Sequence, residues 1–182
     1  MHKSLLAILL FAVTAPLHAS EWSGNLNFFL GGKTLDENDW SPVEQQGEFG
    51  ILVDYKKQDW PVSIAIDLLG SSDDSTFAGF KVEGKTSELD FGVRKVWEFA
   101  GQPIHPFVGG GLGLIGAEYQ VGPLSDSDTS LGVWLNGGVY WTIGEHFNLG
   151  LEARYSQAEV TMFNVNGEAG GSHGGLLLGY HW

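Results

Sequence analysis

The sequence lacks cysteine altogether and is poor in basic residues, with nine Lys and Arg against 22 Asp and Glu in 182 residues. The absence of cysteine excludes disulfides, thiol catalysis and thiolate metal sites. The formal net charge of −13 would repel a polyanion, so nucleic acid is excluded as a partner and cations or basic surfaces are favoured. No segment after residue 20 has the roughly 18 consecutive apolar residues of a transmembrane helix.

The first residues have the pattern of a secretory signal peptide. His2 and Lys3 form a short basic start, residues 5–13 are apolar but too few to span a membrane, and small residues follow up to Ala19. Leu17 is larger than the residue usual at its position, so the cleavage site is defined only to within a few residues. We expect residues 1–19 to be a signal peptide and residues 20–182 to form one domain.

Short segments in which every second residue is apolar recur along the rest of the chain. In the last one, Leu176, Leu178, Tyr180 and Trp182 are apolar. Successive side chains of a strand point to opposite faces, so these four share one face. Helical spacing fits such segments poorly. Eight strands are predicted in this way, at residues 22–33, 48–55, 60–69, 86–97, 107–119, 131–142, 147–157 and 172–182.

One face of the predicted strands is bulky, whereas the other is rich in Gly, Ser and Asn, with Phe29, Trp134 and Tyr140 as exceptions. A soluble β-sandwich or lipocalin-like barrel would hide its bulky residues inside. Eight strands enclose only a narrow interior, so small residues suit the inside and bulky ones the outside. Tryptophans at strand ends indicate a girdle at a membrane interface. They are Trp22, Trp60, Trp97, Trp141 and Trp182.

The connections between the predicted strands alternate in length. Long polar ones cover residues 35–46, 70–85, 120–130 and 158–171, and short ones cover 56–59, 98–106 and 143–146. Alternation of this kind is typical of a barrel with long outer loops and short periplasmic turns. The sequence therefore predicts an all-β fold, an eight-stranded antiparallel transmembrane β-barrel.

The chain resembles the small outer-membrane β-barrel proteins of Gram-negative bacteria, the OmpA/OmpX-like barrel class. The resemblance covers the whole mature chain and rests on residues 88–95 (ELDFGVRK), 106–112 (PFVGGGL), 149–156 (LGLEARYS) and 178–182 (LGYHW). It implies localisation in the outer membrane and contact with its lipid and lipopolysaccharide. It also implies insertion by the barrel assembly machinery, which would read a terminal aromatic strand. The residues of this signal and girdle are Leu178, Tyr180 and Trp182.

Charged residues recur on the small face, which would line the lumen. Because an unpaired buried charge is costly, we expect a salt-bridge network that plugs the lumen around Arg94 and Arg154. The alternative is a narrow, weakly cation-selective pore lined by carboxylates. The surplus of acids implies that some carboxylates are protonated, wetted or bound to a cation. The predicted network consists of Glu48, Asp54, Asp67, Glu88, Asp90, Arg94, Glu152 and Arg154.

A catalytic site is a weaker hypothesis. Ser156, His173 and either Glu159 or Glu168 could form a nucleophile, a base and an orienting carboxylate. Outer-membrane lipid A deacylases resemble this barrel, but they carry a His two residues before the catalytic Ser, where this chain has Arg154. We therefore expect no catalytic residues, cofactor or metal ligands, and keep a lipid A-modifying enzyme as an alternative.

Acidic residues cluster in the predicted outer loops. We expect a solvated acidic surface that contacts divalent cations on lipopolysaccharide or a basic host surface. The spacing does not match an EF-hand. The function expected is that of a non-enzymatic integral barrel protein, serving envelope structure or surface interaction. The acids are Asp36, Glu37, Asp39, Glu44, Asp73, Asp74, Asp126 and Asp128.

Overall fold

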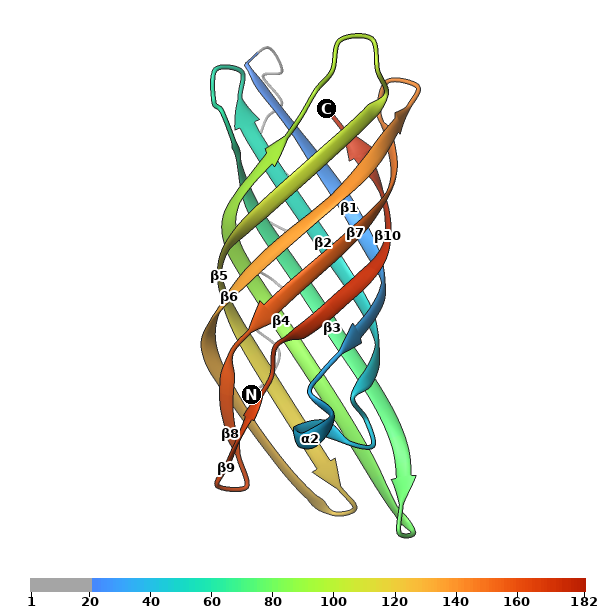
Figure 1. Ribbon diagram of the computed structural model, residues 1–182, viewed down its shortest axis with the longest axis vertical. Helices are drawn as coiled ribbons and strands as arrows, with labels where there is room; N and C mark the ends of the chain where they lie inside the picture. The colour runs from blue at the N-terminus through green and yellow to red at the C-terminus, as the bar shows by residue number, and fades with distance from the viewer. Residues whose placement is uncertain (1–20) are drawn as a thin grey trace.

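The strands close on themselves into a tilted barrel (Figure 1). The computed structural model describes residues 21–182, so the expected signal peptide lies outside the described residues. The barrel order is β1-β10-β7-β6-β5-β4-β3-β2, all antiparallel, which confirms the predicted eight-stranded barrel. Its strands are β1 (Trp22–Thr34), β2 (Gln45–Lys57), β3 (Ser63–Phe77), β4 (Phe80–Val96), β5 (Ile104–Val121), β6 (Leu124–Ile143), β7 (Phe147–Gln157) and β10 (Gly171–His181).

The two ends of the barrel differ in the length of their connections and in the elements that they carry. We call the end with the short connections 58–62, 97–103 and 144–146 the turn end, at the top of Figure 1. The opposite hairpin end carries α2 (Glu37–Trp40), a separate hairpin of β8 (Glu159–Met162) and β9 (Val165–Glu168), and the tips of the β3–β4 and β5–β6 hairpins. Within residues 21–182 no helix is long and apolar enough to cross a membrane.

Two of the expected long loops are mostly strand. β3 and β4 are joined by a tight turn in which Ala78 and Gly79 have φ of 51° and 84°. β5 and β6 are joined at Gly122, with φ of 57°. Such left-handed conformations suit glycine and close a hairpin tightly. Four predicted strands were therefore too short at the hairpin end. β3 and β5 were predicted to end at residues 69 and 119, and β4 and β6 to begin at residues 86 and 131. The missed parts are mostly polar, with only scattered apolar residues such as Val82, so no alternation reveals them.

The outer face of the barrel is an apolar belt. Large side chains there are 37% (Leu68) to 66% (Leu135) exposed, and their partners in the belt include Phe49, Leu151 and Leu176. Towards the hairpin end the outward positions become polar. At the turn end Trp22, Trp60, Trp97 and Trp141 are 38–45% exposed.

The lumen is filled by side chains rather than open. We call the first apolar group inside it the lumen cluster, which contains Phe29 and Tyr140, two of the exceptions to the predicted alternation. A second group, the cap cluster, closes the hairpin end around Trp40 of α2. The lumen cluster is Phe29, Leu52, Leu69, Phe107, Tyr140 and Leu177. The cap cluster is Leu35, Trp40, Val43, Val82, Ile115, Ala117, Ala158, Val160 and Ala169.

Candidate functional site

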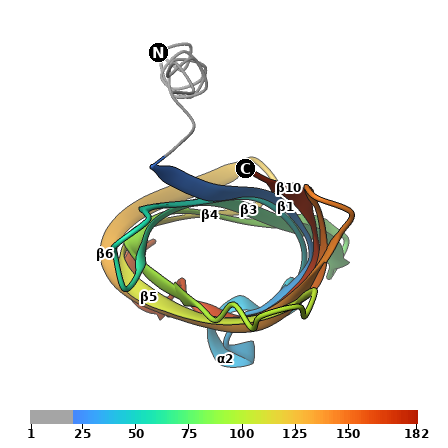
Figure 2. The ribbon, with the colours of Figure 1, turned by 90° about the horizontal axis from the view of Figure 1, so that it is seen from above.

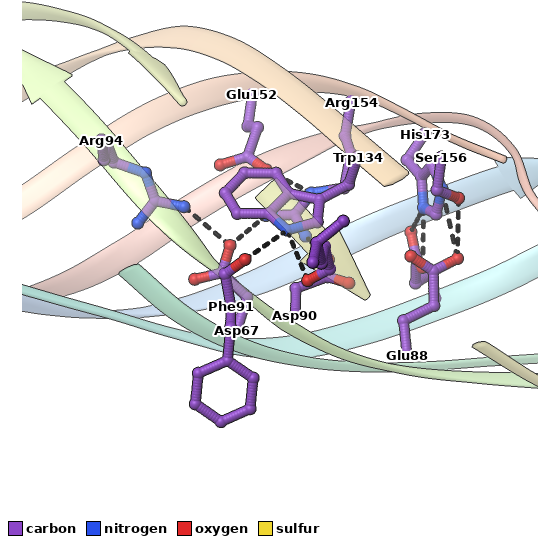
Figure 3. Close-up of polar contacts among 12 residues, drawn as sticks. Asp67, Glu88, Asp90, Phe91, Arg94, Trp134, Glu152, Arg154, Ser156 and His173 are labelled. Carbon is purple, nitrogen blue, oxygen red and sulfur yellow. Dashed lines mark hydrogen bonds and ion pairs between the residues drawn. The ribbon is translucent and has the colours of Figure 1, made fainter. Parts of the chain in front are cut away.

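Two arginines hold four carboxylates inside the lumen. Figure 3 shows both arginines with three of these carboxylates, Asp67, Asp90 and Glu152. Arg94 on β4 reaches two neighbouring strands: its Nη1 lies 3.3 Å from Asp54 Oδ2 and its Nη2 lies 2.7 Å from Asp67 Oδ2. Asn25 Nδ2 donates to the other oxygen of Asp54 at 3.0 Å. Arg94 therefore joins β2, β3 and β4 through charge-assisted hydrogen bonds.

Arg154 on β7 binds three carboxylates. Its Nη1 lies 2.5 Å from Asp90 Oδ2, its Nε lies 3.0 Å from Glu152 Oε1, and its Nη2 contacts the same Asp67 oxygen as Arg94. β7 and β4 are not neighbours in the sheet, so Arg154 spans the lumen. We call these residues the arginine network, and each is at most 4% exposed: Asp54, Asp67, Asp90, Arg94, Glu152 and Arg154.

Aromatic rings cover both guanidinium groups. The Arg154 guanidinium lies 4.9 Å from the Trp134 ring centroid, and that of Arg94 lies 5.6 Å from the centroid of Phe107. These are cation–π contacts, which strengthen away from water. A Cβ at Gly92 would lie 2.8 Å from Trp134 Cζ2, so the small inward residue of β4 makes room for the indole. Trp134, the third exception to the alternation, thus belongs to the packing of the charges.

A second polar network lies between the arginine network and the cap cluster, and sequence reasoning missed its cation, Lys33. Lys33 Nζ is 2.6 Å from Glu88 Oε1, 2.9 Å from Thr86 Oγ1 and 2.9 Å from the Ala169 carbonyl oxygen. Glu88 therefore pairs with a lysine and not with the predicted arginines. The signal was available, because Lys33 shares the inward face of β1 with Asn25.

Ser156 and His173 do meet, but with a different carboxylate from the expected Glu159 or Glu168. Ser156 Oγ lies 3.0 Å from His173 Nε2, and His173 Nδ1 lies 2.9 Å from both carboxylate oxygens of Glu48. This is the order of nucleophile, base and orienting acid in hydrolases. We call Lys33, Glu48, Glu88, Ser156 and His173 the lysine–histidine network.

Burial distinguishes this arrangement from a working catalytic site. Ser156 is 1% exposed, beneath the cap cluster, so a substrate has no route to Oγ in this structure. Its hydroxyl also donates to Glu88 Oε1 at 2.9 Å, which occupies the proton that a base would remove. A nucleophile needs a reacting atom about 3 Å away. The geometry fits a hydrogen-bonded plug better than acyl transfer.

Several of the acids predicted for the outer loops also hold the hairpin end together. On β6, Asp126 Oδ2 accepts the Phe163 amide at 2.6 Å and Asp128 Oδ2 accepts the Thr161 amide at 2.8 Å. These bonds dock the β8–β9 hairpin onto β6. The amides of Thr161 and Thr129 lower the pKa of the Asp128 carboxyl, because they favour its charged form.

The α2 turn is fastened to β9 in the same way. Asp36 caps α2 by accepting the Asn38 amide at 2.8 Å. Asp39 Oδ2 accepts the Glu168 amide at 2.9 Å, while Trp40 Nε1 donates to the Glu168 carbonyl oxygen at 2.7 Å. Two hydrogen bonds thus clasp α2 to β9 over the cap cluster.

The remaining predicted surface acids are exposed or half-buried and do not dock one element onto another. Asp74 lies 3.7 Å from Lys81 as an exposed pair, Glu37 is exposed, and Glu44 and Asp73 are half-buried. Among residues 21–182 no group of three or more His, Cys, Asp or Glu is arranged to hold a metal ion. The acids in the described part of the chain therefore do not form a preorganised metal-binding site.

The turn end carries the closing seam and two cavities. Backbone hydrogen bonds of 3.1 Å in both directions pair Trp182 with Gly24 of β1, while Tyr180 points outward and Leu178 is paired with Phe28. Figure 2 shows β1 and β10 side by side in the closed ring. The larger cavity, about 430 Å³, is lined by Glu98, Phe99, Ala100, His105, Tyr140, Thr142 and His181.

These features define a class of protein. A closed barrel satisfies every strand edge, its belt is apolar outside, its interior is charged and filled, and tryptophans ring one end. Only a barrel or a helix can meet hydrocarbon without unpaired backbone groups. The molecule is thus an integral outer-membrane barrel, with its hairpin end outside the cell. The chain belongs to the outer membrane protein beta-barrel domain family, whose model matches residues 4–182.

Three solved structures illustrate the similarity of fold. Neisserial surface protein A is 16% identical with a TM-score of 0.55, and the match covers 89% of this chain and 96% of that one. Ail of Yersinia pestis, solved with the heparin analogue sucrose octasulfate, is 12% identical with a TM-score of 0.60 and coverage of 90% and 100%. The N-terminal β-barrel of Pseudomonas aeruginosa OprF is 14% identical, at 0.54, with coverage of 87% and 97%. At such identities the likeness shows the fold alone. No curated protein matches the sequence.

Proposed function

We propose that the protein is non-enzymatic and contacts other surfaces through its hairpin end. The observation that carries the proposal is the construction of that end. The cap cluster packs beyond the belt, α2 is clasped to β9, and Asp126 and Asp128 dock the β8–β9 hairpin. A segment held by a core and by hydrogen bonds is preorganised, which lowers the entropic cost of binding.

The chemistry of the hairpin end indicates its partner. Residues 35–46, 71–87, 116–130 and 157–171 contain 12 acidic and two basic residues, a net charge of −10. Exposed apolar side chains stand at the hairpin tips, where Phe77, Phe80, Leu124 and Val165 are 58–67% exposed. Apolar anchors within a charged rim suit a protein partner of opposite charge. We therefore propose a basic protein surface with apolar pockets, whereas a polyanion such as the heparin analogue bound by Ail would be repelled.

Adhesion of bacteria that display the protein tests this proposal. Phe77→Ser with Phe80→Ser should reduce binding to cultured host cells, and soluble polylysine should compete with wild-type binding. Phe99→Ser is the matched control, because Phe99 is 53% exposed but lies at the turn end. Equal adhesion of the tip variant, the control and cells without the protein would overturn the proposal.

We also propose partners within the envelope. The belt would contact membrane lipid, and exposed carboxylates such as Glu37 and Asp74 would approach the divalent cations of lipopolysaccharide. The barrel assembly machinery would recognise the strand that ends at Trp182. The contacts with lipid and with the assembly machinery use the outer wall and the seam of the barrel, so they do not compete with surface binding. Cation bridging at Glu37 and Asp74 would share the hairpin end with the protein partner.

A cation-selective pore is the first rival function. The lumen cluster and the cap cluster favour a closed lumen, and eight-stranded barrels are generally filled by side chains. Planar-bilayer recording of the purified protein should show no discrete conductance steps. Reproducible steps that change in Arg154→Ala would assign the lumen to ion conduction instead.

A lipid A-modifying enzyme is the second rival. It is favoured only by the contacts between Ser156, His173 and Glu48, and the burial of Ser156 argues against it. Mass spectrometry of lipid A from cells with and without the protein should give the same profile. A changed profile that disappears in Ser156→Ala would establish the enzyme and refute our proposal.

A further inference from the structure

The arginine network contains more acids than bases. Four carboxylates face two guanidinium groups, and each of the six side chains is at most 4% exposed. Asp54 pairs with Arg94, and Asp67 is shared by Arg94 and Arg154. These pairings balance both guanidinium charges. Asp90 and Glu152 are then surplus, although both contact Arg154.

Each surplus carboxyl has one oxygen that no group satisfies. Asp90 Oδ1 and Glu152 Oε2 are buried without a hydrogen-bond partner among the described residues. Asp67 Oδ1 also lacks a partner, but the carboxylate of Asp67 contacts both guanidinium groups through its other oxygen. An ionised carboxylate oxygen in such a place carries a desolvation cost of several kcal/mol. The cost of a neutral carboxyl group is much smaller.

The neighbours of Asp90 add repulsion. Asp67 and Asp90 are direct partners in the β3–β4 register and both point into the lumen. Like charges opposite one another destabilise a sheet. Glu88, two residues along β4, faces the same lumen and pairs with Lys33 in the lysine–histidine network. Arg154 is thus the one cation that contacts Asp90 directly among the described residues.

We infer that Asp90 and Glu152 are neutral carboxylic acids in the folded barrel at neutral pH, so that the lumen is a binding site for two protons. Each acid keeps one oxygen as an acceptor for Arg154, and its unpaired oxygen is the place for the proton. The described residues include no arrangement of acids suited to a metal ion that could supply the missing charge. The inference goes beyond the proposed surface function, because it concerns the lumen. Two protons would make the arginine network electrically neutral and so reduce the cost of burying it.

Infrared spectroscopy of the folded protein in lipid vesicles tests the inference directly. A protonated carboxyl gives a carbonyl stretch separate from the amide bands, and this stretch moves in deuterated water. We expect the band in the wild type at neutral pH, about half of it in Asp90→Asn or Glu152→Gln, and none in the double variant. Absence of the band from the wild type, or an undiminished band in the double variant, would overturn the assignment.

Unfolding by urea supplies an independent test with a matched control. The folded barrel would bind more protons than the unfolded chain once the pH exceeds the ordinary carboxyl pKa of about 4, so its stability should fall as the pH rises from there through neutral. Asp90→Asn with Glu152→Gln should fold and lose most of this pH dependence. Asp67→Asn, which removes a carboxylate shared by two arginines, should instead lower the urea midpoint at every pH. A midpoint that follows sodium concentration and not pH would show a bound cation in place of the protons.

Discussion

At the scale of single residues, Arg154 makes the largest set of contacts in the lumen. Arg154→Ala leaves Asp67 without one of its cations and removes the ring contact with Trp134. Breaking a buried ion pair from one side costs about 3–5 kcal/mol. We expect a loss of that size in the free energy of unfolding, measured by urea denaturation in detergent micelles, and a similar loss for Arg94→Ala.

An exposed ion pair gives the matched control for this prediction. Lys57 Nζ lies 3.0 Å from Glu21 Oε2, with both side chains well exposed. Lys57→Ala should change the free energy of unfolding by only about 0–1 kcal/mol, because exposed pairs are screened by solvent. If Arg154→Ala were as mild as Lys57→Ala, the lumen would be wet and the charges hydrated.

The same residues show what the alternating pattern of the sequence can predict and what it cannot. Period-two patterning places Arg94, Arg154 and their carboxylates on one face of the strands, and applied to β1 it places Lys33 there too. The choice of partner depends on the stagger of the strands around the barrel, which brings β4 opposite β7. Contacts such as Arg154 with Asp90, or His173 with Glu48, therefore could not be read from the sequence. They are 64 and 125 residues apart along the chain.

At the scale of elements, the β8–β9 hairpin depends on the ionised carboxylate of Asp128. Its pKa is lowered by the amides it accepts, so the stabilisation is present above the ordinary pKa and is lost as the pH falls through the lowered one. We expect hydrogen exchange at Thr161 and Phe163 to accelerate in acid, relative to the exchange of barrel amides. Asp128→Ala should show the fast exchange at neutral pH as well.

Another acid of the hairpin end, without such a role, serves as the control. Asp73 on β3 is half-buried, and its side chain has no hydrogen bond to the β8–β9 hairpin in residues 21–182. Asp73→Ala should leave exchange at Thr161 unchanged at every pH. Equal protection in Asp128→Ala and Asp73→Ala would mean that packing of Val160 in the cap cluster holds the hairpin without the carboxylate.

Elements at the hairpin end were also the hardest to predict. β7 was predicted with its observed bounds because it alternates fully between apolar and polar residues. α2 has four residues and β8 and β9 have four each, so none is long enough to show a period. These elements are held in place by tertiary contacts such as that of Trp40 with Glu168, which joins segments 128 residues apart.

At the scale of the whole molecule, closure depends on the pairing of β1 with β10. The register runs from Asn25 with His181 to Thr34 with Ser172, and Trp182 extends it by pairing with Gly24. A barrel that fails to close leaves two unpaired strand edges, which hydrocarbon does not tolerate. The final residues therefore bear on assembly through both their backbone and their side chains.

Two changes at Trp182 separate these contributions. Removal of the residue deletes both hydrogen bonds to Gly24 together with the indole, whereas Trp182→Ala deletes only the indole. We expect both to reduce the fraction of folded protein in the outer membrane, with removal the more severe, as measured by heat-modifiable migration on gels. Trp60→Ala, at the same end but in a turn and 40% exposed, should assemble normally. Normal assembly without residue 182 would show that the seam closes, and is recognised, through the strand before it.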